Sequence, residues 1–504
     1  FAFYNAWGIG ANDCANSFAT SVGSKVLTLK QAILIAAIFE FAGAVLMGSH
    51  VTDAIRKKIV DRNIFEDNPG ALMYGMLCAD LSSAIWLTIA TYLKWPVSTT
   101  HSIIGAIVGF SLAYGGRDAV MWEKVGFIVL SWVLSPLLAG IFSSSFFYSI
   151  HRFIFRSSKP YENTMKLFPI ITFFTFFINA LFIIYKGSPQ LELDELPLWV
   201  AIVSALILGT VTALLAQFLY LPYAKKKINR EFDEIEDTEE TAENVKTIEE
   251  LKNNESSTDD DLVRTTSYQE AIEVRDFVEL EDAIKEEEEE KMLVKYDDTK
   301  DIDENIKAGQ IYVKELQDLK LETKISKLHA LADKIDPKAE KLCSWIQIIT
   351  ACFSSFAHGS NDVANAIAPL ATIYHIYRYN EVAKKTEVPI WILVLGGIGI
   401  VIGLATWGYK IINRMGRELT KISTSRGFII ELGAALSVII ASRAEMPVST
   451  THCQVGSIVG CGLVGGRKNV QWGLLQGILF SWLVTLPFTG LLSAGIFSYG
   501  YYSP

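Results

Sequence analysis

Two short polar motifs, each present twice, carry the residues that could do chemistry in this chain. The hexapeptide Pro-Val-Ser-Thr-Thr-His occurs at 96–101 and at 447–452 and supplies three adjacent hydroxyls in each copy. A Gly-x-Asn-Asp sequence occurs at 10–13 and at 359–362. Hydroxyls can donate hydrogen bonds to an oxyanion, whereas carboxylate and amide oxygens are the ligands that hard cations take.

The motifs recur in the same order and at nearly the same spacing. From Asp13 to Pro96 is 83 residues, and from Asp362 to Pro447 is 85. This pattern indicates an internal duplication. Both motifs lie in apolar sequence, where carboxylates and hydroxyls are costly and by default mark a pathway for ions or substrate.

The hydroxyl motif is expected to begin a helix. Pro96 and Pro447 should end the preceding helix, and Ser and Thr are good N-caps. The free N–H groups of a helix start favour an oxyanion. The alternative is that these hydroxyls only cap their own helices. The candidate oxyanion ligands are Ser98, Thr99, Thr100, Ser449, Thr450 and Thr451.

The Asn-Asp motif favours a cation. Asn16 follows Asp13 by three residues, as Asn365 follows Asp362, so each pair shares one face if the helix continues. These four residues are the candidate cation ligands. The alternative is that each aspartate caps a half-helix through its own N–H groups.

An anion site beside an aspartate requires a compensating charge. An oxyanion about 5 Å from a carboxylate is repelled by roughly 3 kcal/mol at an effective dielectric constant near 20. Neither motif contains Lys or Arg to offset that repulsion. Anion and cation should therefore bind poorly alone and well together, which is the basis of symport.

Other polar residues within or near apolar segments are expected to support the site. The acids could complete a cation site, relay protons or form structural pairs. A histidine without a second ligand nearby is more often a hydrogen-bonding residue behind the ligands than a metal ligand. The supporting residues are Asn12, Asn361, Glu40, Asp80, Glu431, His101 and His452.

The elements that position these residues are predicted to be membrane-spanning helices, since the 504-residue chain is 50% hydrophobic and 12% aromatic. The motif-bearing segments count as broken spans, which gives an all-α polytopic membrane protein of about twelve transmembrane segments, seven of them before a charged insert. Stretches of roughly twenty apolar residues, enough to cross a bilayer core, lie at 27–50, 71–93, 125–150, 167–185, 199–220, 390–412, 427–441 and 473–497.

The charged insert divides the chain. The net charge is −10, but residues 224–340 alone carry −17 and the remainder +7. Such an acidic segment is typical of a solvated, largely disordered loop, and the lysines that follow the seventh span place it on the cytoplasmic side. The expected domains are an N-terminal part at 1–222, with a first repeat at about 1–150 and two further spans, the acidic loop at 223–340, and a second repeat at 341–504.

Seven crossings between the two copies would make the repeats antiparallel. Inverted repeats with broken helices or re-entrant hairpins are the architecture of secondary transporters, whose site lies near the midplane between the halves. An intramembrane metalloenzyme built on Asp13, His101, Asp362 and His452 is disfavoured, because the sequence has no closely spaced His or Cys pair and no nucleophile-base arrangement. We therefore expect no enzyme activity.

Both Asn-Asp motifs resemble those of the inorganic phosphate transporter (PiT) family, which has a Gly-Ala-Asn-Asp-Val-Ala-Asn-Ser type motif in each half. Gly10–Ser17 departs from it only at Cys14, and Gly359–Ala366 only at Ser360 and Ala366. The duplicated Pro-Val-Ser-Thr-Thr-His is also typical of the family. The resemblance covers nearly the whole chain apart from the insert.

The resemblance implies cation-coupled uptake of phosphate by alternating access, in a homodimer embedded in a lipid bilayer, expected to be the plasma membrane. It implies that phosphate lies between the two hydroxyl motifs and cations lie beside the aspartates, and that Glu40 and Glu431 matter for transport. Sodium is the implied cation for a eukaryotic member. Proton coupling, sulfate as substrate and a non-transporting phosphate sensor remain alternatives. No cofactor, transition metal or nucleic-acid partner is expected.

Overall fold

The computed structural model describes residues 1–57, 60–186, 196–234, 320–382, 388–443 and 448–503. The contacts divide the chain into two compact units, Phe1–Asn229 with Leu328–Pro504, and Arg230–Lys327. Most of the second unit, residues 235–319, lies outside the described part of the chain. The predicted acidic loop at 223–340 therefore stays a prediction, and the description that follows concerns the first unit.

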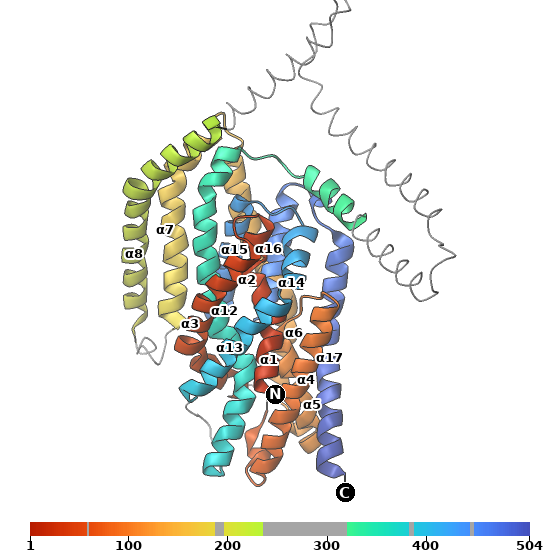
Figure 1. The fold of residues 1–504 in the computed structure, drawn as a ribbon. Helices are drawn as coiled ribbons and strands as arrows, with labels where there is room; N and C mark the ends of the chain where they lie inside the picture. The colour runs from red at the N-terminus through yellow and green to blue at the C-terminus, as the bar shows by residue number, and fades with distance from the viewer. Residues whose placement is uncertain (58–59, 187–195, 235–319, 383–387, 444–447, 504) are drawn as a thin grey trace, which may run out of the picture. The chain divides into compact units, whose positions relative to one another are not determined.

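The first unit is built from α-helices (Figure 1). Its described residues form no β-strand. Short 3-10 turns lie at Arg62–Phe65, Gly116–Ala119 and Arg467–Asn469, and π-helical turns at His151–Phe155, Ala216–Tyr220 and Arg414–Glu418. The helices are α1 (Ala2–Asn12), α2 (Cys14–Gly23), α3 (Leu29–Lys57), α4 (Pro69–Tyr92), α5 (Thr99–Gly115), α6 (Trp122–Ile150), α7 (Pro160–Lys186), α8 (Leu198–Leu215), α12 (Pro337–Tyr379), α13 (Ile390–Trp407), α14 (Tyr409–Asn413), α15 (Thr424–Arg443), α16 (Thr450–Val464) and α17 (Trp472–Tyr502).

Seven helices within the described residues are long and apolar enough to cross a membrane. They coincide with seven of the eight apolar spans predicted from the sequence. The eighth, 427–441, lies in α15, which is helical but falls outside this set. The count of twelve crossings thus stays a prediction. The seven spans are Leu29–Ser49, Pro69–Tyr92, Trp122–Phe155, Pro160–Leu181, Leu198–Glu234, Ile390–Trp407 and Trp472–Tyr502.

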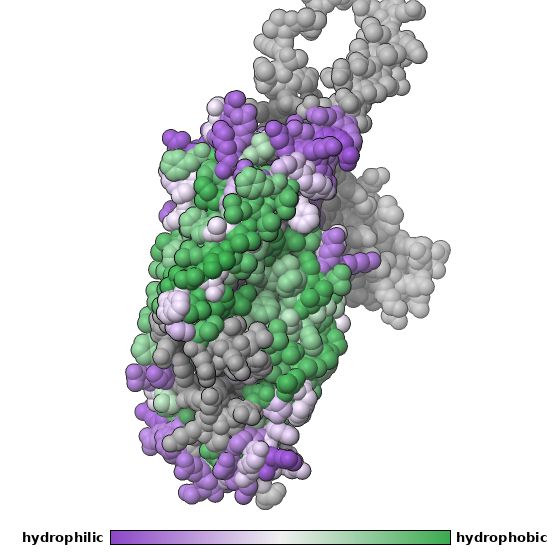
Figure 2. All heavy atoms as spheres, turned by 90° about the vertical axis from the view of Figure 1, so that its left-hand side faces the viewer, coloured by the Kyte–Doolittle hydropathy of each residue, from purple (hydrophilic) through white to green (hydrophobic). Residues whose placement is uncertain are grey.

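Apolar side chains dominate the middle of the molecular face shown in Figure 2, and polar side chains gather at its two ends. The span Leu198–Glu234 contributes to this apolar surface, because only 17% of its most apolar 18-residue stretch is buried inside the protein. Such a large exposed apolar surface is unfavourable in water and suits a lipid environment. The protein is therefore an integral membrane protein.

Corresponding helices of the two halves pack on each other reciprocally. α3 of the first half packs against α12 of the second. In return α13, which corresponds to α3 in the second half, packs against α1 of the first. Likewise α6 packs against α16, and α17 packs against α5. A two-fold relation produces such pairs, because each contact from the first half to the second is repeated from the second to the first. The packing agrees with the duplication inferred from the motifs.

The leading glycine of each Asn-Asp motif lies at one of these contacts. A Cβ on Gly10 would lie 1.8 Å from the carbonyl oxygen of Ile400 in α13, and a Cβ on Gly359 would lie 2.1 Å from that of Glu40 in α3. Both distances are far below van der Waals contact. Only glycine therefore allows the backbones of α1 and α12 to lie this close to their neighbours.

The second Asn-Asp motif departs from the predicted broken helix. Asp13 separates α1 from α2, but Asp362 lies inside α12, which runs unbroken for 43 residues. Even at Asp13 the interruption is local, since its backbone N–H still donates to the carbonyl of Ile9 at 2.8 Å. A helix end is unnecessary at these positions because side chains from other helices satisfy both carboxylates, as described below.

Glycine packing also predicts which substitutions destabilise the fold. A Cβ on Gly109 of α5 would lie 2.0 Å from the carbonyl oxygen of Gly490 in α17, whereas a Cβ on Gly477 would meet nothing within 4 Å. We expect Gly109→Ala to destabilise the protein by about 1–3 kcal/mol through overpacking. The matched control Gly477→Ala should be neutral or slightly stabilising, because alanine favours a helix. Thermal unfolding of the purified variants in detergent measures the difference, and equal midpoints would contradict this packing.

Candidate functional site

The serine of each hydroxyl motif caps a helix, as one of the alternatives predicted. The side chain of Ser98 accepts a hydrogen bond from the backbone N–H of His101 at 3.2 Å, at the start of α5. Ser449 accepts from the N–H of His452 at 3.3 Å, at the start of α16. Pro447, which precedes the second motif, lies outside the described residues.

The threonines of both hydroxyl motifs instead bind the two motif aspartates. Thr99 donates to Asp13 Oδ2 at 2.7 Å, and Thr451 from the other half donates to Asp13 Oδ1. Thr450 donates to Asp362 Oδ2 at 3.1 Å. The capping role therefore belongs to the serines, and the threonine hydroxyls link the hydroxyl motifs to the Asn-Asp motifs.

The motif asparagines complete the connection between the halves. Asn16 Nδ2 donates to Asp13 at 2.8 Å and to Thr451 at 3.0 Å. Asn365 Nδ2 donates to Asp362 and to Thr99, both at 2.9 Å, and to Thr100 Oγ1 at 3.1 Å. Each asparagine thus faces its own aspartate on the helix, as the three-residue spacing predicted, and also reaches the hydroxyl motif of the opposite half.

Neither aspartate caps a helix. Asp13 precedes α2 without any side-chain capping hydrogen bond, and Asp362 lies inside α12. Asp13 is 1% exposed and Asp362 0%. Among the described residues no Lys or Arg forms an ion pair with either carboxylate. Two buried carboxylates that share a single histidine, His358, as their basic neighbour are unfavourable unless a cation or further protons compensate the remaining charge.

The asparagines directly before the aspartates have different roles. Asn12 donates to Thr91 Oγ1 at 3.0 Å and to the Trp95 carbonyl at 2.9 Å, and its oxygen accepts from the N–H of Val97 at 3.0 Å. These bonds hold the segment that leads into the first hydroxyl motif. Asn361 donates to Asp362 Oδ1 at 3.4 Å and lines a cavity beside the site.

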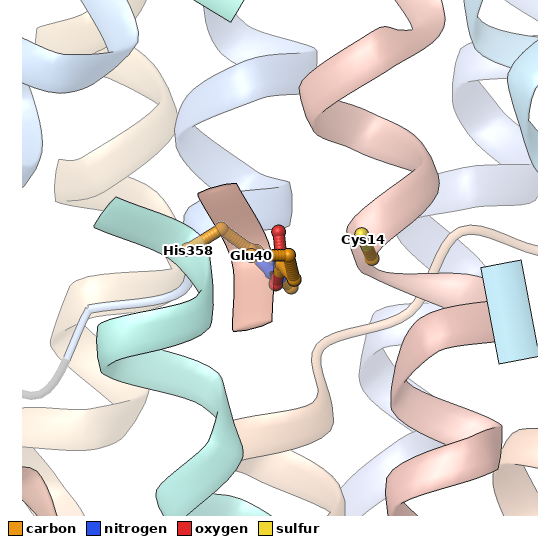
Figure 3. A group of neighbouring side chains, drawn as sticks. All are labelled: Cys14, Glu40 and His358. Atoms are coloured by element: carbon orange, nitrogen blue, oxygen red, sulfur yellow. Dashed lines mark hydrogen bonds and ion pairs between the residues drawn. The ribbon is translucent and has the colours of Figure 1, made fainter. Parts of the chain in front are cut away.

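His358 is the site residue that our sequence analysis missed. Its Nε2 lies 3.0 Å from Asp362 and 3.9 Å from Asp13, and its Nδ1 contacts the carboxylate of Glu40. Figure 3 shows His358 on α12 and Glu40 on α3, together with Cys14. A signal was present, because a histidine directly before Gly359 in an apolar segment is unusual. The first copy has Ile9 at the same place, so the duplication gave no hint.

The aligned acids Asp80 and Glu431 lie in corresponding helices, α4 and α15, but have different surroundings. Asp80 accepts from Asn5 Nδ2 at 2.7 Å, and the same nitrogen donates to the Asn365 carbonyl at 3.3 Å. Glu431 accepts from Thr20 and, at 3.3 Å, from Ser21, both on α2. Glu431 also lines the cavity beside the site, whereas Asp80 does not. Of the two, Glu431 is the nearer to the aspartates' surroundings.

That cavity has a volume of about 60 Å³. Its polar lining comes from the motifs of both halves, from one acid and from other polar residues beside them. The volume is enough for a small ion with water, since a water molecule takes about 30 Å³ of liquid. Among the lining residues are Asn16, Ser17, His358, Asn361, Glu431, Thr450 and Gln454.

The histidines that end the hydroxyl motifs do not support the site through hydrogen bonds, which corrects our prediction. The rings of His101 and His452 are fully buried and lie 4.8 Å apart, centre to centre. None of their ring nitrogens has a hydrogen-bond partner among the described residues. His101 packs on Trp132 and His452 on Trp482, so the pair joins α5 to α16 by ring packing.

Comparison with known proteins gives these contacts a context. The family model described as the phosphate transporter family matches residues 9–493. Sodium-dependent phosphate transporter 1 of Mus musculus is 32% identical, with 97% of this chain and 92% of the relative covered. That of Homo sapiens is 33% identical, with 95% and 92% covered.

A solved structure agrees with the sequence relatives. The structure described as the sodium-dependent phosphate transporter superposes with a TM-score of 0.71 at 29% identity, over 100% of this chain and 98% of the other. The matched residues include both Asn-Asp motifs and both hydroxyl motifs. The chain therefore belongs to the phosphate transporter family.

Proposed function

We propose that this protein is a sodium-coupled phosphate symporter that works by alternating access. One observation carries the proposal, namely that threonine hydroxyls of the two hydroxyl motifs share two buried aspartates. The names of the relatives, sodium-dependent phosphate transporters, support both the substrate and the coupling ion. A transporter of this family has no need of a catalytic centre.

In the proposed site, phosphate lies between the starts of α5 and α16. These two helix starts offer backbone N–H groups that favour an oxyanion. The helices are 17 and 15 residues long, and their first turns are buried. Hydroxyls and N–H groups of both motifs would surround the anion, and the proposed ligands are Ser98, Thr99, Thr100, Ser449, Thr450 and Thr451.

Sodium is proposed to bind beside the same threonines. The ligands would be the carboxylates of Asp13 and Asp362 with the side-chain oxygens of Asn16 and Asn365. Carboxylate, amide and hydroxyl oxygens suit a hard cation. Glu40 and Glu431 would support this site through His358 and the neighbouring cavity.

The threonine hydroxyls supply a physical mechanism for coupling. A hydroxyl has one proton to donate and two lone pairs to accept. In the structure the Thr99 hydroxyl donates a hydrogen bond to Asp13 and accepts one from Asn365. With sodium bound, the cation would balance the charge of the Asp13 carboxylate. The Thr99 hydroxyl would then be available to donate its hydrogen bond to phosphate instead. Without sodium, phosphate would meet an unshielded carboxylate and be repelled.

Alternating access would use the two halves as partners in an inverted repeat. The reciprocal packing of α3 on α12 and α13 on α1 supports this arrangement, as does the shared site. We propose about twelve crossings, an N-terminal part at 1–222 and a second repeat at 341–504. The loop at 223–340 would face the cytoplasm from a homodimer in the plasma membrane.

Removing the aspartate charges should abolish coupled transport. We expect Asp13→Asn combined with Asp362→Asn to lose sodium-dependent uptake of labelled phosphate in proteoliposomes, because an amide cannot balance a bound cation. Asp118→Asn, which changes an exposed acid on the turn before α6, is the control and should transport normally. Uptake by the double variant at the wild-type rate would refute the cation site.

The hydroxyl of Thr99 should contribute to phosphate affinity. Hydrogen bonds to charged groups are worth about 1.5–3 kcal/mol, so Thr99→Val should raise the KM for phosphate roughly 10- to 150-fold. Thr99→Ser keeps the hydroxyl and should stay within about threefold of the wild type. If valine and serine have the same effect, packing rather than hydrogen bonding explains the residue.

Ion replacement distinguishes sodium from proton coupling. Uptake in sodium should exceed uptake in choline at fixed pH, and a pH gradient without sodium should not replace it. Excess arsenate should compete with phosphate, whereas sulfate should not, because an acceptor such as Asp13 in contact with the anion favours one that carries a proton. Equal uptake in choline would favour proton coupling instead.

A further inference from the structure

A cluster of three metal-ligand side chains lies next to the proposed transport site. Cys14, Glu40 and His358 come from α2, α3 and α12, and Figure 3 shows them together. One ligand atom from each residue lies within 4.8 Å of the other two. Cys14 and Glu40 are fully buried, and His358 is 3% exposed. Three helices thus bring a thiol, a carboxylate and an imidazole to one point.

We propose that Cys14, Glu40 and His358 form a binding site for a soft or borderline divalent metal of the Zn²⁺ or Cd²⁺ class. Zinc takes sulfur, nitrogen and oxygen donors at about 2.0–2.3 Å, which separates neighbouring donors by roughly 3–4 Å. To hold the ion, the widest separation in the cluster must close by up to about 1 Å, and Glu40 and His358, which are already in contact, must move slightly apart. Binding releases the thiol proton to solvent, because the thiolate is the ligand form.

The charges around the cluster favour a dication. His358 contacts Glu40 and Asp362 and lies 3.9 Å from Asp13, so three carboxylates surround one imidazole. Among the described residues, none of these carboxylates has a Lys or Arg partner. The thiolate gives this site a different metal preference from the proposed sodium site, since sulfur donors select soft metals and oxygen donors select hard ones.

Of the three ligands, His358 borders the neighbouring cavity, whose lining also includes Asn16 and Asn361. Three protein ligands leave a fourth position of a tetrahedral ion for water or for an oxygen of phosphate. The site is asymmetric between the halves, because the second copy of the motif has Val363 where the first has Cys14.

Metal at this site should inhibit transport, and this consequence rests on the proposed function. A metal bound to His358 and Glu40 would draw the imidazole away from Asp362, which it contacts at 3.0 Å. It would also place a dication beside the proposed sodium ligands. Sodium would then bind less well. Phosphate would also bind less well, because its binding depends on sodium.

Direct metal binding tests the site independently of transport. Titration of purified full-length protein with Co²⁺ should give a thiolate-to-cobalt charge-transfer absorption, and Cys14→Val should lose it. We expect the affinity for Co²⁺ to fall by more than about 100-fold, because even the loss of an outer-shell partner of a ligand costs about 10- to 100-fold. Cys14→Ser provides the same test if the valine variant folds poorly.

Cys352 supplies the matched control. It lies on α12 six residues before His358 and is partly exposed. Any non-specific binding of Co²⁺ to an accessible thiol would therefore occur at Cys352. Cys352→Val should keep the cobalt absorption of the wild type. Persistence of the absorption in Cys14→Val, or its loss in Cys352→Val, overturns the proposal.

Uptake measurements test the inhibitory consequence. Cd²⁺ should inhibit phosphate uptake by the wild type and by Cys352→Val, and at least about tenfold more Cd²⁺ should be needed for Cys14→Val, given the expected loss of affinity. Equal inhibition of Cys14→Val and the wild type contradicts an inhibitory metal at this place. If the protein shows no phosphate uptake at all, the proposed function fails while the cobalt spectra still decide the metal site.

Discussion

Two buried aspartates that have no Lys or Arg partner among the described residues are the constraint on which the rest of the structure depends. Asp13 and Asp362 are almost completely buried, and the groups that face them are hydroxyls, amides and one imidazole. Removing a carboxylate from water without a counter-charge costs several kcal/mol. Burial of both carboxylates therefore requires a compensating positive charge or protons nearby, and the fold must hold the surrounding polar groups in place.

Close backbone packing makes such precise positioning possible. The hydrogen bonds of Thr99 and Thr451 to Asp13 require that α5, α16 and the α1–α2 junction keep their positions relative to one another. Glycines on both hydroxyl helices remove side-chain bulk from the contacts with α6 and α17. Tightly packed interiors have few alternative arrangements. A rigid frame of this kind favours a change between two discrete states over a gradual deformation of the site.

Much of this organisation could be predicted from the sequence, because the duplication and the apolar spans are direct consequences of composition and spacing. Seven spans, the helix starts at Ser98 and Ser449, and the pairing of Asn16 with Asp13 were all predictable in this way. The role of His358 was not, because a histidine in an apolar segment marks an unusual residue but does not show that α3 and α12 lie side by side and bring it to Glu40. The continuity of α12 was also missed, since the polar motif-bearing segments were counted as broken spans. For His101 and His452, residue type suggested hydrogen bonds, but neighbouring tryptophans provide ring packing instead.

The unbroken course of α12 has a mechanical consequence. The helix has 43 residues, which corresponds to about 65 Å at 1.5 Å per residue, roughly twice the thickness of a bilayer core. It begins at Pro337, in the last residues of the acidic segment, and carries His358, Asp362 and Asn365 along its length. A helix is stiff along its axis, so a displacement at Pro337 reaches the buried carboxylates without crossing a flexible joint. A single rigid helix thus connects the last residues of the acidic segment to the two buried aspartates.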